Sequence, residues 1–429
     1  MKKSKKLRST AKKTAFSAWI GTFFSEIRSR KWVLPVFAGT ILLVVGGVFL
    51  FSWITRPKKP GIAFYHIPPN LVEALTQSAS NTALSGETGF TFLALDDSLP
   101  LGEQLENQKN RISVLFAPVG QAPASLASEV SAPAERIRRL LPTTIRNAGS
   151  SGKNVYALPI LLDHFELACS KAILSRNNAS EPKSISEMLE TARKVKTKRV
   201  WPIICAGSRD QDLLLLVGTL MHTQYGLDAY RLLVTEIRKG SPFDTILSET
   251  RLADVLETLL SWRRDRLLHP QWLEMTGEDL AAFMRFDNAV FVFMPLSARR
   301  NLDPKTAEKY TSIAVPPEVK ASSYPLTAPV YAGMRIRNEL FADAAEQFLY
   351  SLVQEEAQIR LSRDTGLAPA NAKAPVNDKQ AYDVRYWAAA SRVLVPDPVT
   401  AAVDDPARIA SFAEEIRTYI RDGGKLLKQ

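Results

Sequence analysis

The stretch Gly61-Ile62-Ala63-Phe64-Tyr65-His66 is a short apolar run, stopped by Pro68-Pro69 and followed by apolar residues at helical spacing over 71–78. A buried strand that leads directly into a helix is the first unit of an α/β layer. Two further apolar runs, 89–95 and 111–116, have the pattern of buried strands that end in polar or proline-containing loops. This alternation predicts an α/β fold with a largely parallel sheet, in which ligands bind beyond the carboxyl ends of the strands.

An uncharged apolar run, Val33–Ile54, precedes this region. Its 22 residues would reach about 33 Å as a helix, enough to cross a hydrocarbon core of roughly 30 Å. A cleaved signal peptide would have a shorter apolar run and a small-residue cleavage site, and no cysteine follows directly to take a lipid. The sequence therefore predicts one uncleaved N-terminal transmembrane helix at 33–54 and a linker at 55–60.

The basic charge of the chain is concentrated ahead of that run. Residues 1–32 hold ten Lys or Arg and a single acid, Glu26, against a formal net charge of +11 for the whole chain. Short segments rich in Lys and Arg stay in the cytoplasm, where anionic lipids attract them. We therefore expect a cytoplasmic leader, a single pass through the cytoplasmic membrane, a periplasmic or extracellular domain at 61–429, and no nucleic-acid partner. Residues 15–27 are either an interfacial amphipathic helix or the start of a longer, tilted span.

Motifs typical of enzymes are missing from the sequence. It has no G-x-S-x-G elbow, Walker loop, H-E-x-x-H or G-x-G-x-x-G pattern. Its four histidines, at 66, 164, 222 and 269, have no metal-ligand spacing. We expect neither catalysis, nor a metal, nor a cofactor, and an envelope enzyme with unrecognised catalytic residues is the weaker alternative.

The two cysteines, Cys169 and Cys205, fall on candidate strands. A compartment outside the cytoplasm would permit a disulfide between them, but a bridge needs Cα atoms within about 7 Å. The sequence leaves a disulfide and two free buried thiols both open.

Two helices have clear sequence signals. Ser184 as N-cap with Glu187 three residues later predicts a capping box. Near the end of the chain, apolar spacing over Ile409–Ile420 predicts an amphipathic helix that packs on a lobe.

Later motifs occur in the order of a known family. Tyr156-Ala157-Leu158-Pro159, Asp163 and Cys169–Leu174 correspond to a Y-x-L-P turn, a polar residue that faces the ligand, and an N-K-x-L segment. Further matches follow at 182–189, 200–225, 283–295, 310–317, 330–336, 344–360 and 365–370. Together they resemble the bacterial extracellular solute-binding proteins of ABC importers, in the maltose-binding-like group.

The resemblance implies a two-lobed periplasmic-binding-protein-like fold, with a hinge of two or three crossings and an interlobe cleft that closes on its ligand. Lobe 1 is expected at about 61–158 and 276–320, and lobe 2 at about 159–275 and 321–429. The implied partners are a small polar solute, such as a sugar or oligosaccharide, and an ABC permease in the same lipid bilayer. The alternative keeps the fold without transport, as a sensor or scaffold of the cell envelope.

Departures from the family pattern weaken the sugar assignment. The family's glycine-lysine pair appears as Asp287-Asn288, and its G-P-W as Met294-Pro295-Leu296. Sugar pockets of this group stack aromatic faces on pyranose rings, and that tryptophan is absent. The aromatic residues at the candidate loop ends are Tyr65, Phe116, Tyr324 and Tyr331.

Candidate ligand-binding residues lie at the ends of the expected strands. They are Tyr65, His66, Phe116, Asp163, Ser208, Arg209, Tyr324 and Tyr331. The loop 207–210 could bind an anion through its backbone N–H groups, with Arg209 as the partner of an acidic group. Alternatively, Ser208 or Asp210 caps the next helix. Asp163 is either part of the pocket or a solvated loop carboxylate, and Asp97 is expected in a solvated turn.

Overall fold

The computed structural model describes residues 59–82, 89–197, 199–318, 326–337, 339–374, 391, 393–402 and 405–424. The expected leader at 1–32 and the expected span at 33–54 lie outside these residues, as does Tyr324. Within the described ranges, every helix is too short or too polar to cross a membrane. The residues from Lys59 onward form one compact unit.

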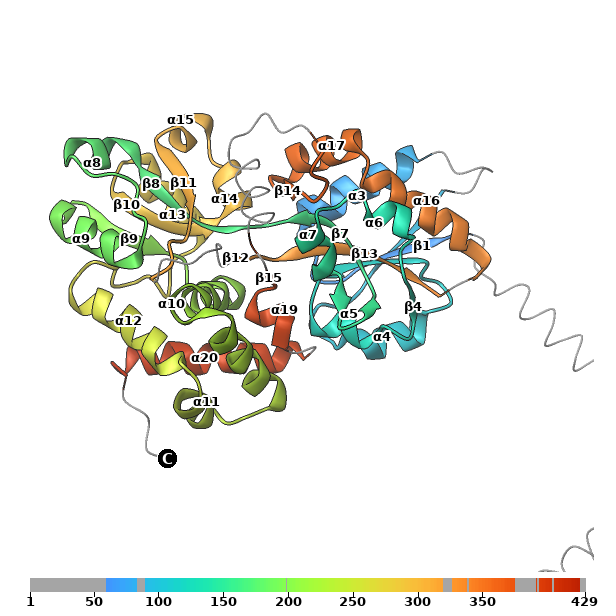
Figure 1. The fold of residues 1–429 in the computed structure, drawn as a ribbon, viewed down its shortest axis with the longest axis horizontal. Coiled ribbons are helices and arrows are strands. Elements are labelled where there is room, and N and C mark those ends of the chain that lie inside the picture. Colours follow the sequence, from blue (N-terminus) through green and yellow to red (C-terminus); the bar gives the residue numbers. More distant parts are fainter. Residues whose placement is uncertain are drawn as a thin grey trace, which may run out of the picture. The chain divides into compact units, whose positions relative to one another are not determined.

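The first sheet has seven strands in the order β14-β7-β13-β3-β1-β2, with β4 beside β13 (Figure 1). Its strands are β1 Gly61–Phe64, β2 Thr91–Ala94, β3 Val114–Pro118, β4 Val130–Ser131, β7 Leu158–Leu162, β13 Val330–Ile336 and β14 Ala368–Pro369. Its helices are α3 Pro69–Asn81, α4 Leu101–Gln108, α5 Gln121–Ser125, α6 Glu135–Arg138, α7 Thr143–Ala148, α16 Ala342–Leu352 and α17 Glu355–Thr365. β1 lies between β2 and β3 and is parallel to both, so the apolar run that begins at Gly61 is buried within the sheet.

The second sheet has four strands in the order β11-β8-β10-β9. They are β8 Phe165–Ser170, β9 Trp201–Cys205, β10 Ala289–Pro295 and β11 Tyr310–Ala314. The helices of this half are α8 Lys171–Arg176, α9 Ile185–Val195, α10 Asp210–Lys239, α11 Phe243–Glu249, α12 Leu252–Arg264, α13 Gly277–Arg285, α14 Leu296–Arg300, α15 Pro304–Ala307, α19 Pro398–Ala402 and α20 Pro406–Arg421. Two short pairs lie apart from these sheets, β5 Ser150–Ser151 with β6 Asn154–Val155, and β12 Leu326–Thr327 with β15 Leu394–Val395.

Both sheets are mixed, which corrects the expectation of largely parallel strands. β13 runs antiparallel to β3 and β7, and β8 runs antiparallel to β10 and β11. The run 89–95 is also not a buried strand, because β2 lies at the edge of its sheet with Phe92 exposed. An apolar run indicates a strand, but it carries no information about strand direction or about which strands flank it.

Each sheet has its own hydrophobic core, and this gives the two lobes. The chain leaves the first core after β7, returns to it between β11 and β13, and leaves it again between β14 and α19. The expected lobe boundaries are therefore wrong for most of 276–374, whereas α19 and α20 lie in the second lobe as expected. β10 and β11 pair with β8, which puts most of 276–320 in the second lobe, whereas β13, α16 and α17 pack in the first. Both β10 and β13 are buried apolar strands, so their composition does not indicate which sheet they join.

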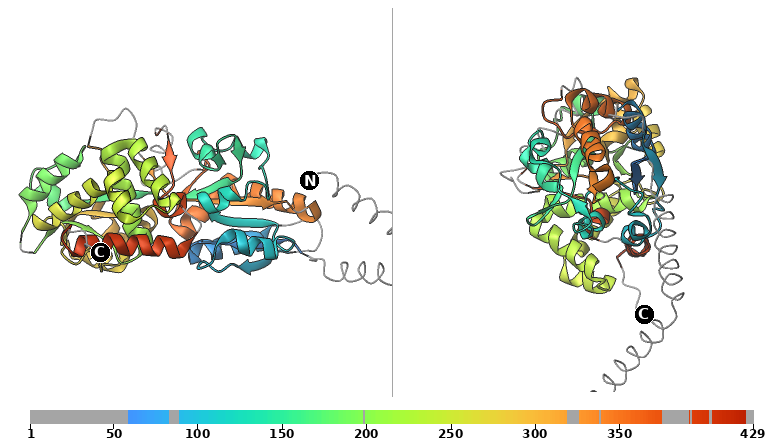
Figure 2. Two further views of the ribbon diagram at one scale, coloured as in Figure 1. Left: turned by 90° about the horizontal axis from the view of Figure 1, so that it is seen from below. Right: turned by 90° about the vertical axis from the view of Figure 1, so that its right-hand side faces the viewer.

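Two helix predictions can be compared directly with the structure. Ser184 caps α9 by accepting from the Glu187 N–H at 3.1 Å, but the Glu187 carboxylate accepts from the N–H of Lys183 rather than from that of Ser184. The N-cap is confirmed, and the reciprocal bond of the capping box is displaced by one residue. The predicted C-terminal amphipathic helix is α20, which buries Ile409 and Ile416 in the second core and packs against α10 and α12 (Figure 2).

Cys169 and Cys205 are free and buried. They lie on β8 and β9, which both pair with β10 and not with each other. Two strand spacings separate them by more than about 9 Å, beyond the reach of a disulfide. The disulfide alternative is therefore wrong, and burial raises the pKa of both thiols well above the usual range.

Candidate functional site

A cavity of about 450 Å³ opens where residues of both lobes meet. Its walls come from the segments after β1 and β3, from β13, from the junction of β9 with α10, and from the C-terminal helices α19 and α20. This volume lies within the range of pockets that hold small molecules. As expected for an α/β fold, most of these segments follow the carboxyl ends of strands.

Tyr65 and His66 form the wall that follows β1. The Tyr65 side chain is 3% exposed, and its hydroxyl donates to the Leu99 carbonyl at 3.0 Å. His66 has a left-handed backbone with φ of 50°, which non-glycine residues rarely adopt. Its N–H donates to Asp97 Oδ1 at 2.6 Å, and its ring meets the Tyr65 ring edge-on with centroids 4.4 Å apart. The carboxylate of Asp97 thus holds the strained turn at the edge of the cavity.

The junction of β9 and α10 forms the facing wall, where Arg209, Asp210 and Gln211 line the cavity. The Arg209 guanidinium donates from Nε and Nη2 to the two carboxylate oxygens of Asp212, at 2.8 and 2.9 Å. These hydrogen bonds raise the pKa of Arg209. The arginine expected to meet an acidic ligand group is therefore already paired with a carboxylate of its own helix.

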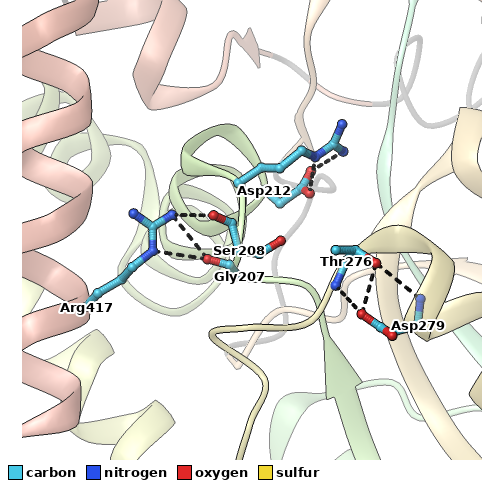
Figure 3. Close-up of polar contacts among 7 residues, drawn as sticks. Gly207, Ser208, Asp212, Thr276, Asp279 and Arg417 are labelled. Atoms are coloured by element: carbon cyan, nitrogen blue, oxygen red, sulfur yellow. Dashed lines mark hydrogen bonds and ion pairs between the residues drawn. The ribbon is translucent and has the colours of Figure 1, made fainter.

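Arg417 hydrogen-bonds to the backbone of this junction at Gly207 and Ser208 (Figure 3). It projects from α20, is 7% exposed, and donates to the carbonyl of Gly207 from Nε and Nη2 at 3.2 Å and to that of Ser208 from Nη2 at 2.9 Å. Its Nη1 lies 2.7 Å from Asp210 Oδ1. The planar guanidinium therefore binds the carbonyls of Gly207 and Ser208, which accept no hydrogen bond within α10, and also the carboxylate of Asp210, the first residue of that helix.

The same junction is held on its other side by the segment before α13. The N–H groups of Gly207 and Ser208 both lie 3.3 Å from the Met275 carbonyl. The next residue, Thr276, forms a capping box with Asp279 that starts α13 (Figure 3). A Cβ at position 207 would lie 2.9 Å from the Trp272 ring, so this close approach requires glycine.

Tyr331 lies on β13 and lines the cavity, with only 6% of its surface exposed. Within the described ranges, no residue hydrogen-bonds its hydroxyl. Burial raises the pKa of Tyr331 well above its usual value, and the nearby carboxylates of Asp163 and Asp397 act in the same direction. The phenol therefore stays protonated and is able to donate to a ligand.

Three predicted residues lie elsewhere. Phe116 is 1% exposed and stacks on Phe64 in the first core. Ser208 does not line the cavity, and neither it nor Asp210 caps α10, because the N-cap position is Arg209 and makes no side-chain cap bond. The Ser208 side chain instead points into a buried position, where its Oγ has no hydrogen-bond partner within the described residues.

Asp163 lies at the crossing from β7 to β8, buried and away from the cavity lining. Its carboxylate accepts from the N–H of Ser297 at 3.0 Å and from the Ser297 hydroxyl at 2.6 Å, at the start of α14. Burial raises the pKa of Asp163 to about 6, although the Ser297 bonds oppose the shift. Neither alternative from the sequence holds, since this carboxylate is neither solvated nor in the pocket, and it fixes the crossing between the lobes.

The cavity also contains residues that the sequence did not single out. Thr400, Asp405 and Ile409 come from the C-terminal segment, and Asp97 comes from what was expected to be a solvated turn. The only available signal for Asp405 was its position before Pro406, typical of a helix N-cap, and its side chain does cap α20 by accepting from the Ala407 N–H at 3.0 Å. In the part of the chain that the structure describes, no group of three His, Cys, Asp or Glu residues could hold a metal ion.

Comparisons with known proteins agree with this architecture. One similar solved structure is the bacterial solute receptor AcbH, with an exclusive preference for β-D-galactopyranose; its TM-score is 0.67 at 14% identity, over 85% of this chain and 94% of that chain. A sugar transporter from Bacillus licheniformis in complex with stachyose has a TM-score of 0.61 at 11% identity, over 85% of this chain and 97% of that chain. The GacH receptor of Streptomyces glaucescens, solved unliganded and with acarbose, has a TM-score of 0.60 at 13% identity, over 86% of this chain and 94% of that chain. A search of curated proteins finds no match. The family model described as bacterial extracellular solute-binding protein matches residues 104–388. With two thirds of its length matched to that model, the chain belongs to the bacterial extracellular solute-binding proteins.

Proposed function

We propose that this chain is the membrane-tethered substrate-binding component of an ABC-type importer, and that it binds a small polar solute, a sugar or oligosaccharide, between its lobes. The observation that carries the proposal is the cavity of about 450 Å³, whose walls combine two tyrosines with polar side chains from both lobes. A solute that contacts both lobes stabilises the closed arrangement over the open one. The solved structures with bound stachyose and acarbose support a saccharide as the class of solute.

The tether and the permease are the finer parts of the proposal. The predicted span at 33–54 would keep the solute-binding unit at the membrane surface, close to a permease in the same bilayer. Such a tether raises the effective concentration of the receptor at its partner without any new contact. The receptor would then deliver its solute without diffusing through the envelope.

Thermal unfolding of the full-length protein in a mild detergent, screened against sugars, oligosaccharides, polyamines and amino acids, tests the binding function. A solute that binds only the native state at about 100 times its Kd adds about 2.7 kcal/mol to the free energy of unfolding, and so raises the Tm. No shift across the library would contradict binding and favour the scaffold alternative.

A matched pair of variants locates the binding site. Gln211 is exposed and lines the cavity, and its side chain makes no hydrogen bond with any described residue, so Gln211→Trp fills the cavity without removing a side-chain hydrogen bond. Gln77 is an exposed glutamine on α3, outside the cavity. We expect Gln211→Trp to abolish the ligand-induced shift and Gln77→Trp to keep it. Equal shifts in the two variants would place the solute elsewhere.

A further inference from the structure

The charged residues of the cavity are mostly acidic. Among the residues that the structure describes, Asp97, Asp210 and Asp405 line it together with one guanidinium, that of Arg209. Carboxylates on a cavity wall commonly act as helix caps and turn residues. The partner of each charged group therefore decides whether its charge is available to a solute.

Two of these charges are cancelled by partners outside the cavity lining. Arg209 forms a bidentate salt bridge with Asp212, whose side chain is 8% exposed. Asp210 lies 2.7 Å from the guanidinium of Arg417. An opposite charge at hydrogen-bond distance leaves little net field for a solute group farther away. Arg209 is therefore a poor anchor for an anion.

The other two carboxylates have no permanent cation beside them among the described residues. Asp97 accepts from the His66 N–H through Oδ1, and the nearest ring nitrogen of His66, 3.9 Å from Oδ2, carries charge only when protonated. Asp405 accepts from the Ala407 N–H through Oδ1. Each uses one oxygen to accept from a backbone N–H and leaves the other for a solute. The described lining of the cavity is therefore net negative.

Tyr331 supplies an independent indication of a polar ligand. Its side chain is more than nine-tenths buried, it lines the cavity, and its hydroxyl has no hydrogen-bond partner in the described part of the chain. The hydroxyl is not among the fully buried polar atoms that lack a partner, so it is accessible from the cavity, where a ligand oxygen can take the place of water. The phenol can both donate to and accept from a solute hydroxyl.

We propose that the cavity selects an amino-bearing, positively charged sugar over a neutral one and rejects acidic sugars, with Tyr331 bound to a ring substituent oxygen and Asp97 and Asp405 attracting the ammonium group. This inference rests on the proposed function and names the chemical class of its solute. The positive group would replace the missing cation beside the two carboxylates. A carboxylate on the solute would instead meet like charge, with Arg209 already occupied.

Isothermal titration of the full-length protein in detergent with glucosamine, glucose and glucuronate tests this selectivity, at a pH where the amine is protonated. An exposed ion pair changes affinity by up to about fivefold, so glucosamine should bind about fivefold more tightly than glucose, and glucuronate more weakly than both. Added salt should reduce the difference. Glucuronate binding as tightly as glucosamine would overturn the inference.

Neighbouring aspartates provide the matched variants. Asp97→Asn keeps an oxygen for the His66 N–H but removes the charge, and it should lower the ratio of glucosamine affinity to glucose affinity several-fold. Asp96 does not line the cavity, and its carboxylate bonds Ser98, so Asp96→Asn should leave the ratio unchanged. Equal ratios in the two variants would refute the role of Asp97. If other solutes bind but none of these three does, the inference fails and the proposed function stands; if nothing in the broad screen binds, the proposed function fails.

Discussion

Removing the guanidinium of Arg417 tests how the C-terminal helix supports the cavity wall. In Arg417→Met the aliphatic part of the side chain can still pack, but the carbonyls of Gly207 and Ser208 lose their donors and Asp210 loses its ion-pair partner. Hydrogen bonds to a charged group contribute about 1.5–3 kcal/mol each, and removing one member of a buried pair costs about 3–5 kcal/mol. Because Asp210 is 36% exposed and can be solvated, we expect a loss near the lower limit, about 3 kcal/mol in the free energy of unfolding.

Urea unfolding followed by tryptophan fluorescence measures this loss. Trp272, one of seven tryptophans, is fully buried and its ring packs against Gly207, so its emission contributes to the signal when the junction unfolds. Arg421 provides the control, because it lies on the same helix, is 47% exposed and pairs with Glu414. Arg421→Met should change stability by less than about 0.5 kcal/mol. If Arg417→Met is no worse than Arg421→Met, the junction does not depend on this guanidinium and the reasoning is wrong.

Three other changes have defined outcomes. Gly120→Ala would put a Cβ 1.8 Å from the Thr400 carbonyl oxygen, so we expect a loss of about 1–3 kcal/mol by thermal unfolding together with weaker solute binding, whereas Gly102→Ala, with no atom within 4 Å, should be neutral or slightly stabilising. Burial raises the pKa of Asp163 from 3.8 to about 6, so the carboxyl holds its proton to a higher pH in the native state than in the unfolded chain. The protonated carboxyl therefore contributes about 3 kcal/mol to the free energy of unfolding at low pH, and this contribution is lost as the pH rises from about 4 to 6. Asp163→Asn should flatten that part of the pH–stability curve, and an unchanged slope would refute the assignment. Ser184→Ala removes the acceptor for the Glu187 N–H and should cost about 1 kcal/mol in urea, while a change near zero would mean that the cap is solvated at no cost.

Local patterns predicted much of the fold. The run from Gly61 is β1, the helical spacing after Pro68-Pro69 is α3, and the apolar spacing near the end of the chain is α20. These signals come from neighbouring residues, whose spacing directly reports which face is buried. Pairing between distant strands has no such signal, and for this reason β10 and β11 were expected in the wrong lobe.

The residues of the cavity also fall into those that local sequence could predict and those that depend on the packing of distant segments. That Tyr65 and His66 line the cavity could be predicted, because they come at the carboxyl end of a strand, where ligands collect in α/β sheets. The place of Asp405 in the cavity could not be predicted, because it depends on how α20, more than 300 residues after β1 in the chain, packs across the second lobe. The pairing of Arg209 with Asp212 could not be predicted either, because it depends on a side-chain geometry that the sequence leaves open.

The position of α20 has a consequence for how the receptor matures. The N-cap and the first turn of this helix supply Asp405 and Ile409 to the cavity, and Arg417, farther along the helix, contacts the junction of β9 and α10. Every described strand of both sheets precedes these residues in the chain, so a polypeptide that has formed both sheets still lacks part of its cavity wall. Binding in this cavity would therefore begin only once α20 has packed against the second core.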